Sequence, residues 1–443
     1  MATSPIAESQ AGALLRARPS RLALRLPMLW LAVLALLAMS LWEVRAIDAH
    51  FRAGLDHNDL IGRWLGTRAA LHGADPYSPA MKRQIQAIAD HDKSSAFDYP
   101  ATFAVLMAPL ALLSWKSASL LYLAFVIPGL ALAIWVVIRL VGPSLPSRAR
   151  ALITLAALGS WPAMWALRLW QPSLLTVIFL FAGCFLLSRG GDVGAGILFA
   201  LAAIKPQIVL PLLLVLLLWT ILRRQWSFLL AFAATSIALL ALAELMVPGW
   251  IPHWLASLHD YQRLCGKLPL ETLFGSTGGR TVAVALGLGT VLRLWTLRHS
   301  FTPGRGAPGS LGRLEPTSLA TYAYIVALLL ALPVAINTTT PLMIYNDLFL
   351  LPGCVLLCTT RSTNDLGMLA RRFAQLWLAW ALLIVPVAIV ADAFSGAAQI
   401  GEKLVFMNPL FGSAVTLFLL LNAPVRSGRV ASPAVQANAQ PAL

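Results

Sequence analysis

An aspartate in the first long polar stretch of the chain, Asp59, is the residue that we expect to do acid–base chemistry. Residues 58–72 have the spacing of an amphipathic helix, and Gly73 is placed to end it. The apolar side of this helix would carry Leu60, Trp64 and Leu71. Asp59 would then lie in the first turn, at the mouth of a membrane cavity, where a carboxylate can take a proton from a substrate hydroxyl. The alternative is structural, because Asn58 or Asp59 could simply cap the helix.

A lysine between two apolar runs, Lys205, is the cation that we expect to bind a phosphate group. Ionisable groups within apolar stretches are costly to desolvate and are mostly functional, and lysine pairs with phosphate as a point charge. Arg168 and Gln171, at another turn between apolar runs, are expected to share this role. The alternative for all three is interfacial: Lys205 would extend its ammonium group to the membrane surface, and the other two would cap a turn.

Three further sets of polar residues are candidates for contacts with a sugar or an acceptor. They are Asp75, Tyr77 and Tyr99 in the first polar stretch, His259 and Asp260 beside His253 and Tyr261, and Tyr345, Asn346 and Asp347 at the start of a late apolar run. For the second set, the sequence favours an amphipathic surface helix over such a contact. A buried Asp347 would need a partner or a wet cavity.

The sequence contains no pattern that is typical of a bound metal or nucleotide. It has no Gly-rich phosphate loop, no Asp-x-Asp pair, and no zinc or serine-hydrolase pattern. The cysteines lack metal-ligand spacing, and most lie in apolar runs, where cysteine behaves as a small hydrophobe; they are Cys184, Cys265, Cys354 and Cys358. We therefore expect no metal site, no cofactor and no disulfide.

Long apolar runs make up most of the chain. Of its 443 residues, 59% are hydrophobic and 12% are charged, whereas a soluble domain usually carries about a quarter charged residues. Several runs approach the roughly 20 residues that cross the hydrocarbon core. The sequence therefore predicts an all-α polytopic membrane protein with about 12 transmembrane helices, surrounded mainly by membrane lipids.

The expected spans are separated by short basic or broken segments. They cover residues 28–47, 117–140, 151–164, 172–187, 193–204, 207–222, 226–247, 280–297, 318–336, 341–358, 373–392 and 403–422. Residues 99–114 are short and contain Pro109, which predicts a re-entrant or surface hairpin. Irregular backbone at membrane depth needs protein or water around it, so the Trp-Pro and Lys-Pro breaks indicate a cavity that opens towards the outer face.

The distribution of positive charge predicts the orientation of these spans. The net charge of +15 is divided among short clusters between apolar runs, which argues against a nucleic-acid partner and fits the positive-inside rule. We expect a cytoplasmic N-terminal tail over 1–27, a retained signal anchor at the start of a transmembrane domain over 28–422, and a disordered cytoplasmic tail over 423–443. Residues 49–98 and 248–279 would then form extracytoplasmic loops.

Several motifs, in the same order along nearly the whole chain, resemble those of glycosyltransferase family 87. The most specific is Ile204-Lys205-Pro206-Gln207, preceded by Gly194-Ala195-Gly196. The others are Asp59 followed by Gly73 and Asp75-Pro76-Tyr77, then Tyr99-Pro100 with Ala108-Pro109-Leu110, Gln171-Pro172-Ser173, and Pro341 with Tyr345-Asn346-Asp347. Three positions depart from the family pattern: Arg63-Trp64 replaces an aromatic pair, Ala101 replaces a proline, and Trp170 replaces a glycine.

The resemblance implies a GT-C-like fold in a bacterial inner (plasma) membrane, with amphipathic helices in a large first extracytoplasmic loop. It implies transfer of a hexose, with mannose expected, from a polyprenyl-phosphate donor to an extracytoplasmic lipid or glycan acceptor. It also implies inversion at the transferred sugar, no obligatory metal, and Asp59 as the general base.

Two other classes of membrane protein fit parts of the sequence. A secondary transporter of a polar or lipid-linked solute also has broken helices and buried ionisable residues, but such proteins typically contain internal repeats, and none is evident between the two halves. A non-catalytic scaffold would not need polar residues gathered at helix breaks.

Overall fold

In a computed structural model of the chain, the described residues are 58–88, 96–142, 145–264, 269–297, 344–359, 368–381 and 414, and every regular element within them is a helix. This agrees with the all-α class expected from the sequence. The spans expected at 28–47, 318–336 and 403–422, together with both tails, lie outside the described residues apart from residue 414.

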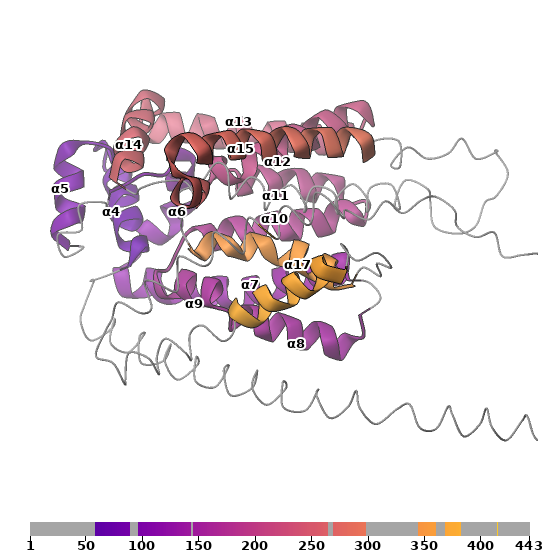
Figure 1. Cartoon of the computed structure of the whole chain (residues 1–443). Helices are drawn as coiled ribbons and strands as arrows, with labels where there is room; N and C mark the ends of the chain where they lie inside the picture. Colours follow the sequence, from indigo (N-terminus) through magenta and orange to yellow (C-terminus); the bar gives the residue numbers. More distant parts are fainter. Residues whose placement is uncertain are drawn as a thin grey trace, which may run out of the picture.

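Four helices that carry many of the polar candidates gather at one end of the molecule (Figure 1). They are α4 (Asp59–Leu71), α5 (Pro79–Ile88), α6 (Ala101–Ala111) and α14 (Trp250–Leu264). The helix expected over 58–72 is α4, and it ends at Gly73, whose φ of +76° belongs to the left-handed region that glycine adopts at low cost. The end group formed by these four helices is where the polar residues from distant parts of the chain meet.

The packing of α4 differs from the expectation of a helix lying on the membrane surface. It packs against α6 and is buried around most of its circumference, including at Arg63 and Thr67. Leu71, expected on the apolar side, is 36% exposed. The reason is that small residues let other segments approach closely: a Cβ at Gly66 would collide with the ring of Phe97.

The remaining helices form a bundle in which the main contacts join helices one to three places apart along the chain. The first is α7 (Trp115–Val141), which packs against α10 (Ser173–Ser188). In turn, α10 contacts α11 (Asp192–Ala202), and α11 contacts α13 (Trp226–Met246). Gly196 allows the last approach, because a Cβ there would lie 2.5 Å from the carbonyl oxygen of Phe228. Such small residues are typical of close helix packing in membranes.

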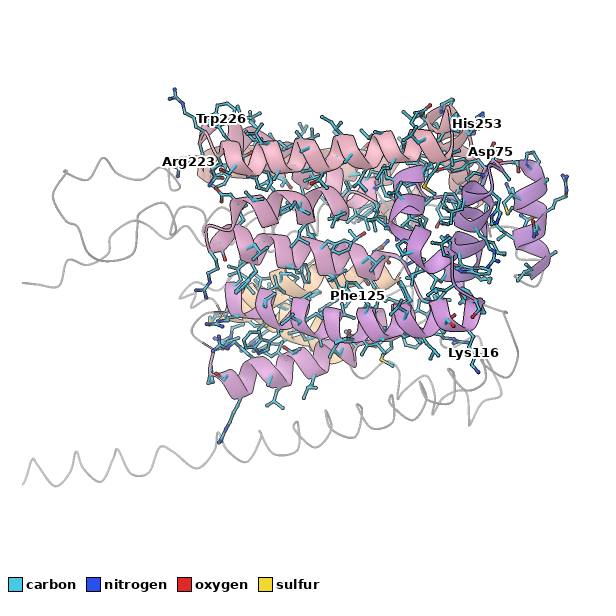
Figure 2. All side chains as sticks on the ribbon, turned by 180° about the vertical axis from the view of Figure 1, so that it is seen from behind. Asp75, Lys116, Phe125, Arg223, Trp226 and His253 are labelled. Carbon is cyan, nitrogen blue, oxygen red and sulfur yellow. The ribbon has the colours of Figure 1, made fainter. Side chains whose placement is uncertain are left out.

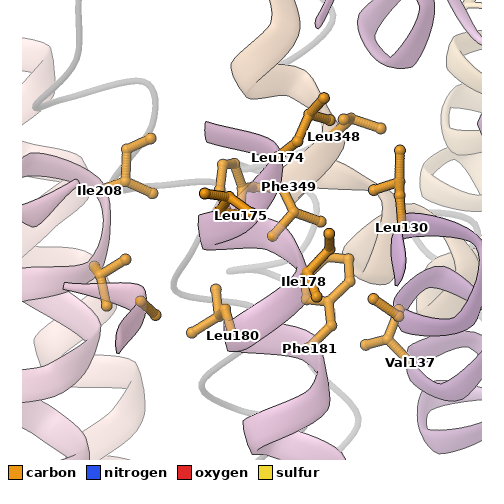
Figure 3. Packing of buried hydrophobic residues seen from close by; sticks show 14 of the residues in the cluster. Leu130, Val137, Leu174, Leu175, Ile178, Leu180, Phe181, Ile208, Leu348 and Phe349 are labelled. Atoms are coloured by element: carbon orange, nitrogen blue, oxygen red, sulfur yellow. The ribbon is translucent and has the colours of Figure 1, made fainter. Parts of the chain in front are cut away.

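The centre of the bundle is apolar (Figure 3). Ile178 and Phe181 of α10 face Leu130 and Val137 of α7 in this core. The ring of Phe181 also meets that of Phe349, 6.4 Å away between centroids, on the 3₁₀ helix η2 (Ile344–Leu350). η2 leads directly into α17 (Leu351–Thr359), so the late part of the chain completes the core that α7 and α10 begin.

Two helices among the described residues are long and apolar enough to cross a membrane. α7 has 27 residues with a mean hydropathy of 2.5, and α13 has 21 residues with 2.1; at 1.5 Å per residue these lengths are about 40 and 31 Å, against roughly 30 Å of hydrocarbon. On α13, Leu230 and Leu245 are 68% and 79% exposed, which is expected where a helix faces lipid. The chain is therefore a membrane protein.

Among the other described helices, α10 and α11 lie within two residues of the spans expected over 172–187 and 193–204, whereas one expected span is divided. The expected span at 151–164 is divided by Gly159 and Ser160 into α8 (Ser147–Leu158) and α9 (Trp161–Arg168). The chain turns again before α12 (Pro206–Leu222), and α15 (Pro269–Leu297) contains a kink at Gly275, where φ is +72°. α6, expected in a hairpin, has 11 residues, about 16 Å of helix and too short to cross the hydrocarbon core alone. The number of about 12 spans stays a prediction.

The two ends of the bundle carry the residues that the positive-inside rule assigns to opposite sides. Asp75, Lys116 and His253 lie at one end, and Arg223 and Trp226 at the other (Figure 2). With single cysteines in a background free of the native ones, an impermeant maleimide should label exposed Gln84→Cys on α5 in intact spheroplasts. It should label exposed Ser227→Cys on α13 only after permeabilisation. Labelling of both positions from the same side would contradict this orientation.

Candidate active site

Asp59 is the first residue of α4, but it does not cap that helix. The side chain of Asn58 accepts a hydrogen bond from the backbone N–H of Ile61 (2.9 Å), which is the capping interaction. The backbone N–H of Asp59 donates to the carbonyl oxygen of Leu169 (2.9 Å), in the turn after α9. The carboxylate therefore faces that turn, at the positive end of the α4 dipole, which favours the anionic form.

Gln171 is buried and joins Asp59 to the turn after α9. Its Nε2 donates a hydrogen bond to Oδ2 of Asp59, and its Oε1 accepts one from the hydroxyl of Tyr99 (3.4 Å). Its backbone carbonyl accepts another from the hydroxyl of Tyr122 (2.9 Å). These contacts hold the amide in place and favour a role in orienting the Asp59 carboxylate rather than the phosphate contact expected from the sequence.

The turn before Gln171 has the hydrogen bonds of a Schellman motif. The N–H of Gln171 donates to the carbonyl oxygen of Ala166 (2.8 Å), and that of Trp170 donates to Leu167 (3.0 Å). The residue between helix and turn, Trp170, has φ of +51°, a conformation that usually requires glycine. Its side chain is 4% exposed and stacks on Trp115, with 5.7 Å between ring centroids. Aromatic packing thus holds the strained backbone that presents Gln171 to Asp59.

Substitutions at Trp170 should separate the contribution of its aromatic packing from the cost of its positive φ. Trp170→Ala should destabilise the protein by about 3–5 kcal/mol through lost packing. Trp170→Gly should lose the same packing but recover about 1–2 kcal/mol, because glycine adopts positive φ without strain. We expect a higher thermal midpoint for Trp170→Gly than for Trp170→Ala, measured in the same detergent. The reverse order would show that the left-handed conformation carries no strain.

Lys205 lies in the turn between α11 and α12, with only 7% of its surface exposed. Burial lowers its pKa to about 7; the negative charge of Asp59 raises it and the positive charge of Arg63 lowers it. Lys205 is thus within electrostatic reach of both α4 residues. The structure brings together the carboxylate and the cation that the sequence analysis singled out, although many residues separate them along the chain.

A second buried cation, Arg63, lies one helical turn after Asp59. It is 7% exposed, its Nη1 donates to the backbone carbonyl of Asp59 (2.9 Å), and its guanidinium carbon lies 5.3 Å from the centroid of the Tyr99 ring. Burial by itself would lower the pKa of Arg63, but the charges of Asp59 and Asp98 raise it above its usual value. Arg63 was noted in the sequence only as a departure from the family pattern.

Asp98 is a second carboxylate beside Arg63, and α14 holds it. The hydroxyl of Ser257 donates to its Oδ1 (3.0 Å), and Nε1 of Trp254 donates to its backbone carbonyl (3.1 Å). Its Oδ2 is buried without a hydrogen bond among the described residues. Burial raises the pKa of Asp98 to about 6, against the lowering effect of Arg63 and Ser257.

Two expected sugar-binding residues, Asp75 and Tyr77, make contacts within the end group. The Oδ1 of Asp75 accepts from the backbone N–H of Tyr77 (2.9 Å), and its Oδ2 lies 3.0 Å from Nδ1 of His253. The hydroxyl of Tyr77 donates to the carbonyl oxygen of Tyr99 (2.8 Å). These contacts give Asp75 and Tyr77 a structural role; nothing in them tests a contact with a sugar.

The second half of α14 follows the expectation of an amphipathic surface helix. Asp260 lies 3.3 Å from Nζ of Lys82 on α5, with 56% of the Asp260 side chain exposed. His259 is also exposed. Both residues are therefore on the outer side of the end group rather than beside Asp59.

The remaining candidates lie on α9 and on η2, which packs against α9. The guanidinium carbon of Arg168 is 5.0 Å from the centroid of the Trp165 ring. Asn346 and Asp347 are buried on η2, which packs against α9 and α10, and Oδ1 of Asn346 and Oδ2 of Asp347 make no hydrogen bond among the described residues. The side chain of Tyr345 lies outside the described residues.

Two residues of the site, Arg63 and Asp98, had not been assigned to it from the sequence, which offered one signal for Arg63. Asp59 and Arg63 are four positions apart, a spacing that puts both on the same face of a helix. Within the described ranges, no three His, Cys, Asp or Glu side chains are grouped as metal ligands would be. The site therefore consists of one oriented carboxylate, two buried cations and a second carboxylate.

Comparison with known proteins places the chain in a family. The model of glycosyltransferase family 87 matches residues 97–336, more than half of the chain. No curated protein and no solved structure matches. The matched part contains Tyr99, Gln171 and Lys205 but begins after Asp59, so the contact with Gln171 is what joins Asp59 to the matched part. The chain belongs to glycosyltransferase family 87 and is a membrane-bound glycosyltransferase.

Proposed function

We propose that this glycosyltransferase moves a hexose, with mannose expected, from a polyprenyl-phosphate donor to an extracytoplasmic lipid or glycan acceptor. The observation that supports this most directly is that Lys205, before α12, lies within electrostatic reach of Asp59, the carboxylate on α4 that Gln171 holds. Transfer from a lipid phosphate needs a base for the acceptor hydroxyl and a cation for the departing phosphate. These two residues supply both.

In the proposed reaction, Asp59 accepts the proton of the acceptor hydroxyl as its oxygen attacks the anomeric carbon of the sugar. The new carbon–oxygen bond forms on the face opposite the phosphate, so the configuration at that carbon is inverted. The bond from the anomeric carbon to the phosphate oxygen breaks, and its electron pair leaves with the lipid phosphate. Gln171 keeps one oxygen of Asp59 in place through the step.

Lys205 is proposed to stabilise the phosphate. Its burial places the charge in surroundings where electrostatic interactions are stronger than in water. A lipid-linked donor also suits the position of the site, because the end group adjoins the end of α13 from which α14 continues, where a polyprenyl tail in the membrane would present its phosphate. The exposed leucines of α13 are available to such a tail.

The location that we propose is a bacterial plasma membrane, with both termini in the cytoplasm and the end group outside. The acceptor would then be outside as well. Membership of a glycosyltransferase family argues against the transporter and scaffold alternatives.

The experiment that tests the proposal is a transfer assay with purified protein. Polyprenyl-phosphate mannose, glucose and arabinose would be supplied separately, together with a native lipid extract, and products identified by mass spectrometry. We expect transfer of mannose with an inverted anomeric linkage. Transfer from a nucleotide sugar alone, or uptake of labelled donor into liposomes without product, would overturn it.

A further inference from the structure

Arg63 is the buried charged residue of the end group that the proposed reaction does not yet use. It is 7% exposed, and its Nη1 is fixed by the backbone carbonyl of Asp59. The ring of Tyr99 covers the guanidinium group at 5.3 Å. Its Nε, however, is buried and makes no hydrogen bond to any of the described residues. A buried donor on a charged group without a partner is costly, so this atom is available to a bound ligand.

The titratable groups near Arg63 come from α4, from the segment before α6 and from α14. Asp59, Asp98, Tyr99 and Tyr261 act on its charge, and Arg63 in turn acts on Lys205. Two buried cations and two half-buried carboxylates thus lie within electrostatic reach of one another. The two carboxylates are each held by a hydrogen bond, Asp59 from Gln171 and Asp98 from Ser257. An incoming anion would therefore meet two cations in the same region.

The proposed reaction changes the charge of the phosphate. A sugar joined through a phosphodiester carries one negative charge, whereas the released lipid phosphate is a monoester with a charge of about −1.5 to −2 near pH 7. The additional charge develops as the bond to the sugar breaks. A cation that meets this added charge stabilises the transition state more than the bound donor, and such an interaction raises the rate rather than the affinity for the donor.

We propose that Arg63 receives the charge that develops on the departing lipid phosphate, while Lys205 holds the charge that the donor carries from the start. The inference rests on the proposed lipid-phosphate donor. Arg63 suits the role because its planar guanidinium can bind two phosphate oxygens, and because its contacts with Asp59 and Tyr99 keep it in position before the donor arrives.

The test compares binding of two short lipid phosphates to the purified full-length protein at pH 6.5, where Lys205 and the second charge of the phosphate are both largely present. Farnesyl phosphate carries the second charge, and its methyl ester does not. The wild-type protein should bind farnesyl phosphate roughly 10- to 100-fold more tightly than the ester, in keeping with a hydrogen bond to a charged group. Arg63→Met should remove this preference and keep the affinity for the ester within about twofold. Lys205→Met should weaken both ligands.

A matched control is available on the same helix. Arg68 is exposed on α4, with its guanidinium carbon 5.2 Å from the centroid of the Trp64 ring, and Arg68→Met should keep the preference. Arg63→Lys retains charge without the planar fork, so it should keep part of the preference, and thermal midpoints establish that each variant is folded. If Arg63→Met does not fold, the role of Arg63 is tested by the preference for farnesyl phosphate over its ester in the wild type and in Arg63→Lys.

The outcomes separate this inference from the proposed function. A wild-type protein that binds neither lipid phosphate would refute the lipid-phosphate donor itself. Equal wild-type affinity for the two ligands would refute only the role of Arg63, as would a preference that survives in Arg63→Met or is lost equally in Arg68→Met.

Discussion

Asp59→Asn is expected to lower the turnover of the purified enzyme by roughly 10²- to 10⁴-fold, the share that a positioned general base contributes. Asparagine has nearly the same size as aspartate but cannot accept the proton of an acceptor hydroxyl. The thermal midpoint should stay close to that of the wild type, because the cap of α4 is Asn58 and not Asp59. Turnover and thermal unfolding of the same preparation measure both effects.

The neighbouring residue provides the matched control. Asn58→Ala should remove the hydrogen bond to the N–H of Ile61 and cost about 1 kcal/mol of stability, while the folded fraction keeps its turnover. Asp59→Asn would thus lower turnover without lowering stability, whereas Asn58→Ala would lower stability without lowering turnover. Near-normal turnover in Asp59→Asn would refute the base role and direct attention to Asp98, the other buried carboxylate of the end group.

Lys205→Met is expected to lower kcat/KM for the lipid-phosphate donor by roughly 10²- to 10³-fold, the range found when one group that stabilises a developing anion is removed. Methionine keeps much of the apolar stem but removes the ammonium charge. KM for the acceptor should stay within about twofold, because the lost contact is to the leaving group. Lys205→Arg should keep part of the activity, since the charge survives in a different shape. Normal donor kinetics in Lys205→Met would reduce the residue to an interfacial anchor.

The pH profile gives an independent reading of Lys205. Burial lowers its pKa to about 7, so the cation is present below that pH and is lost as the pH rises through it. We expect kcat/KM for the donor to fall on the alkaline side of this value. Arginine remains charged over the whole range, so Lys205→Arg should lose this alkaline limb. An unchanged limb in Lys205→Arg would assign it to another group.

The sequence identified best those residues whose position depends on local sequence patterns. Apolar periodicity located α4, and Gly73 marked its end, because glycine alone adopts positive φ cheaply. The Lys-Pro break located the turn that carries Lys205, since a proline cannot continue the preceding hydrogen-bond ladder. The gap between two apolar runs located the turn that carries Gln171. The family resemblance, carried by the same turns, is confirmed by the match over 97–336.

The sequence could not predict contacts that depend on tertiary packing. Asp75 pairs with His253, and Asp98 pairs with Ser257, so these contacts join segments that are far apart along the chain. No local sequence pattern predicts which polar residues will meet in this way. The division of 151–164 at Gly159 was missed because a short apolar run reads as one helix whether or not it breaks. Arg63 was missed for a related reason: its burial depends on tertiary contacts such as that with the ring of Tyr99.

Asp59 is hydrogen-bonded to Gln171 and lies near Lys205, and both residues are synthesised after it. The order of synthesis therefore determines when the site can form. A ribosome that adds about 5–20 residues per second needs roughly 7–30 s to proceed from Asp59 to Lys205. Throughout that interval Asp59 and Arg63 have been synthesised and Lys205, whose charge later lies within their electrostatic reach, has not. The charge arrangement of the site can therefore form only after Lys205 has been added to the chain.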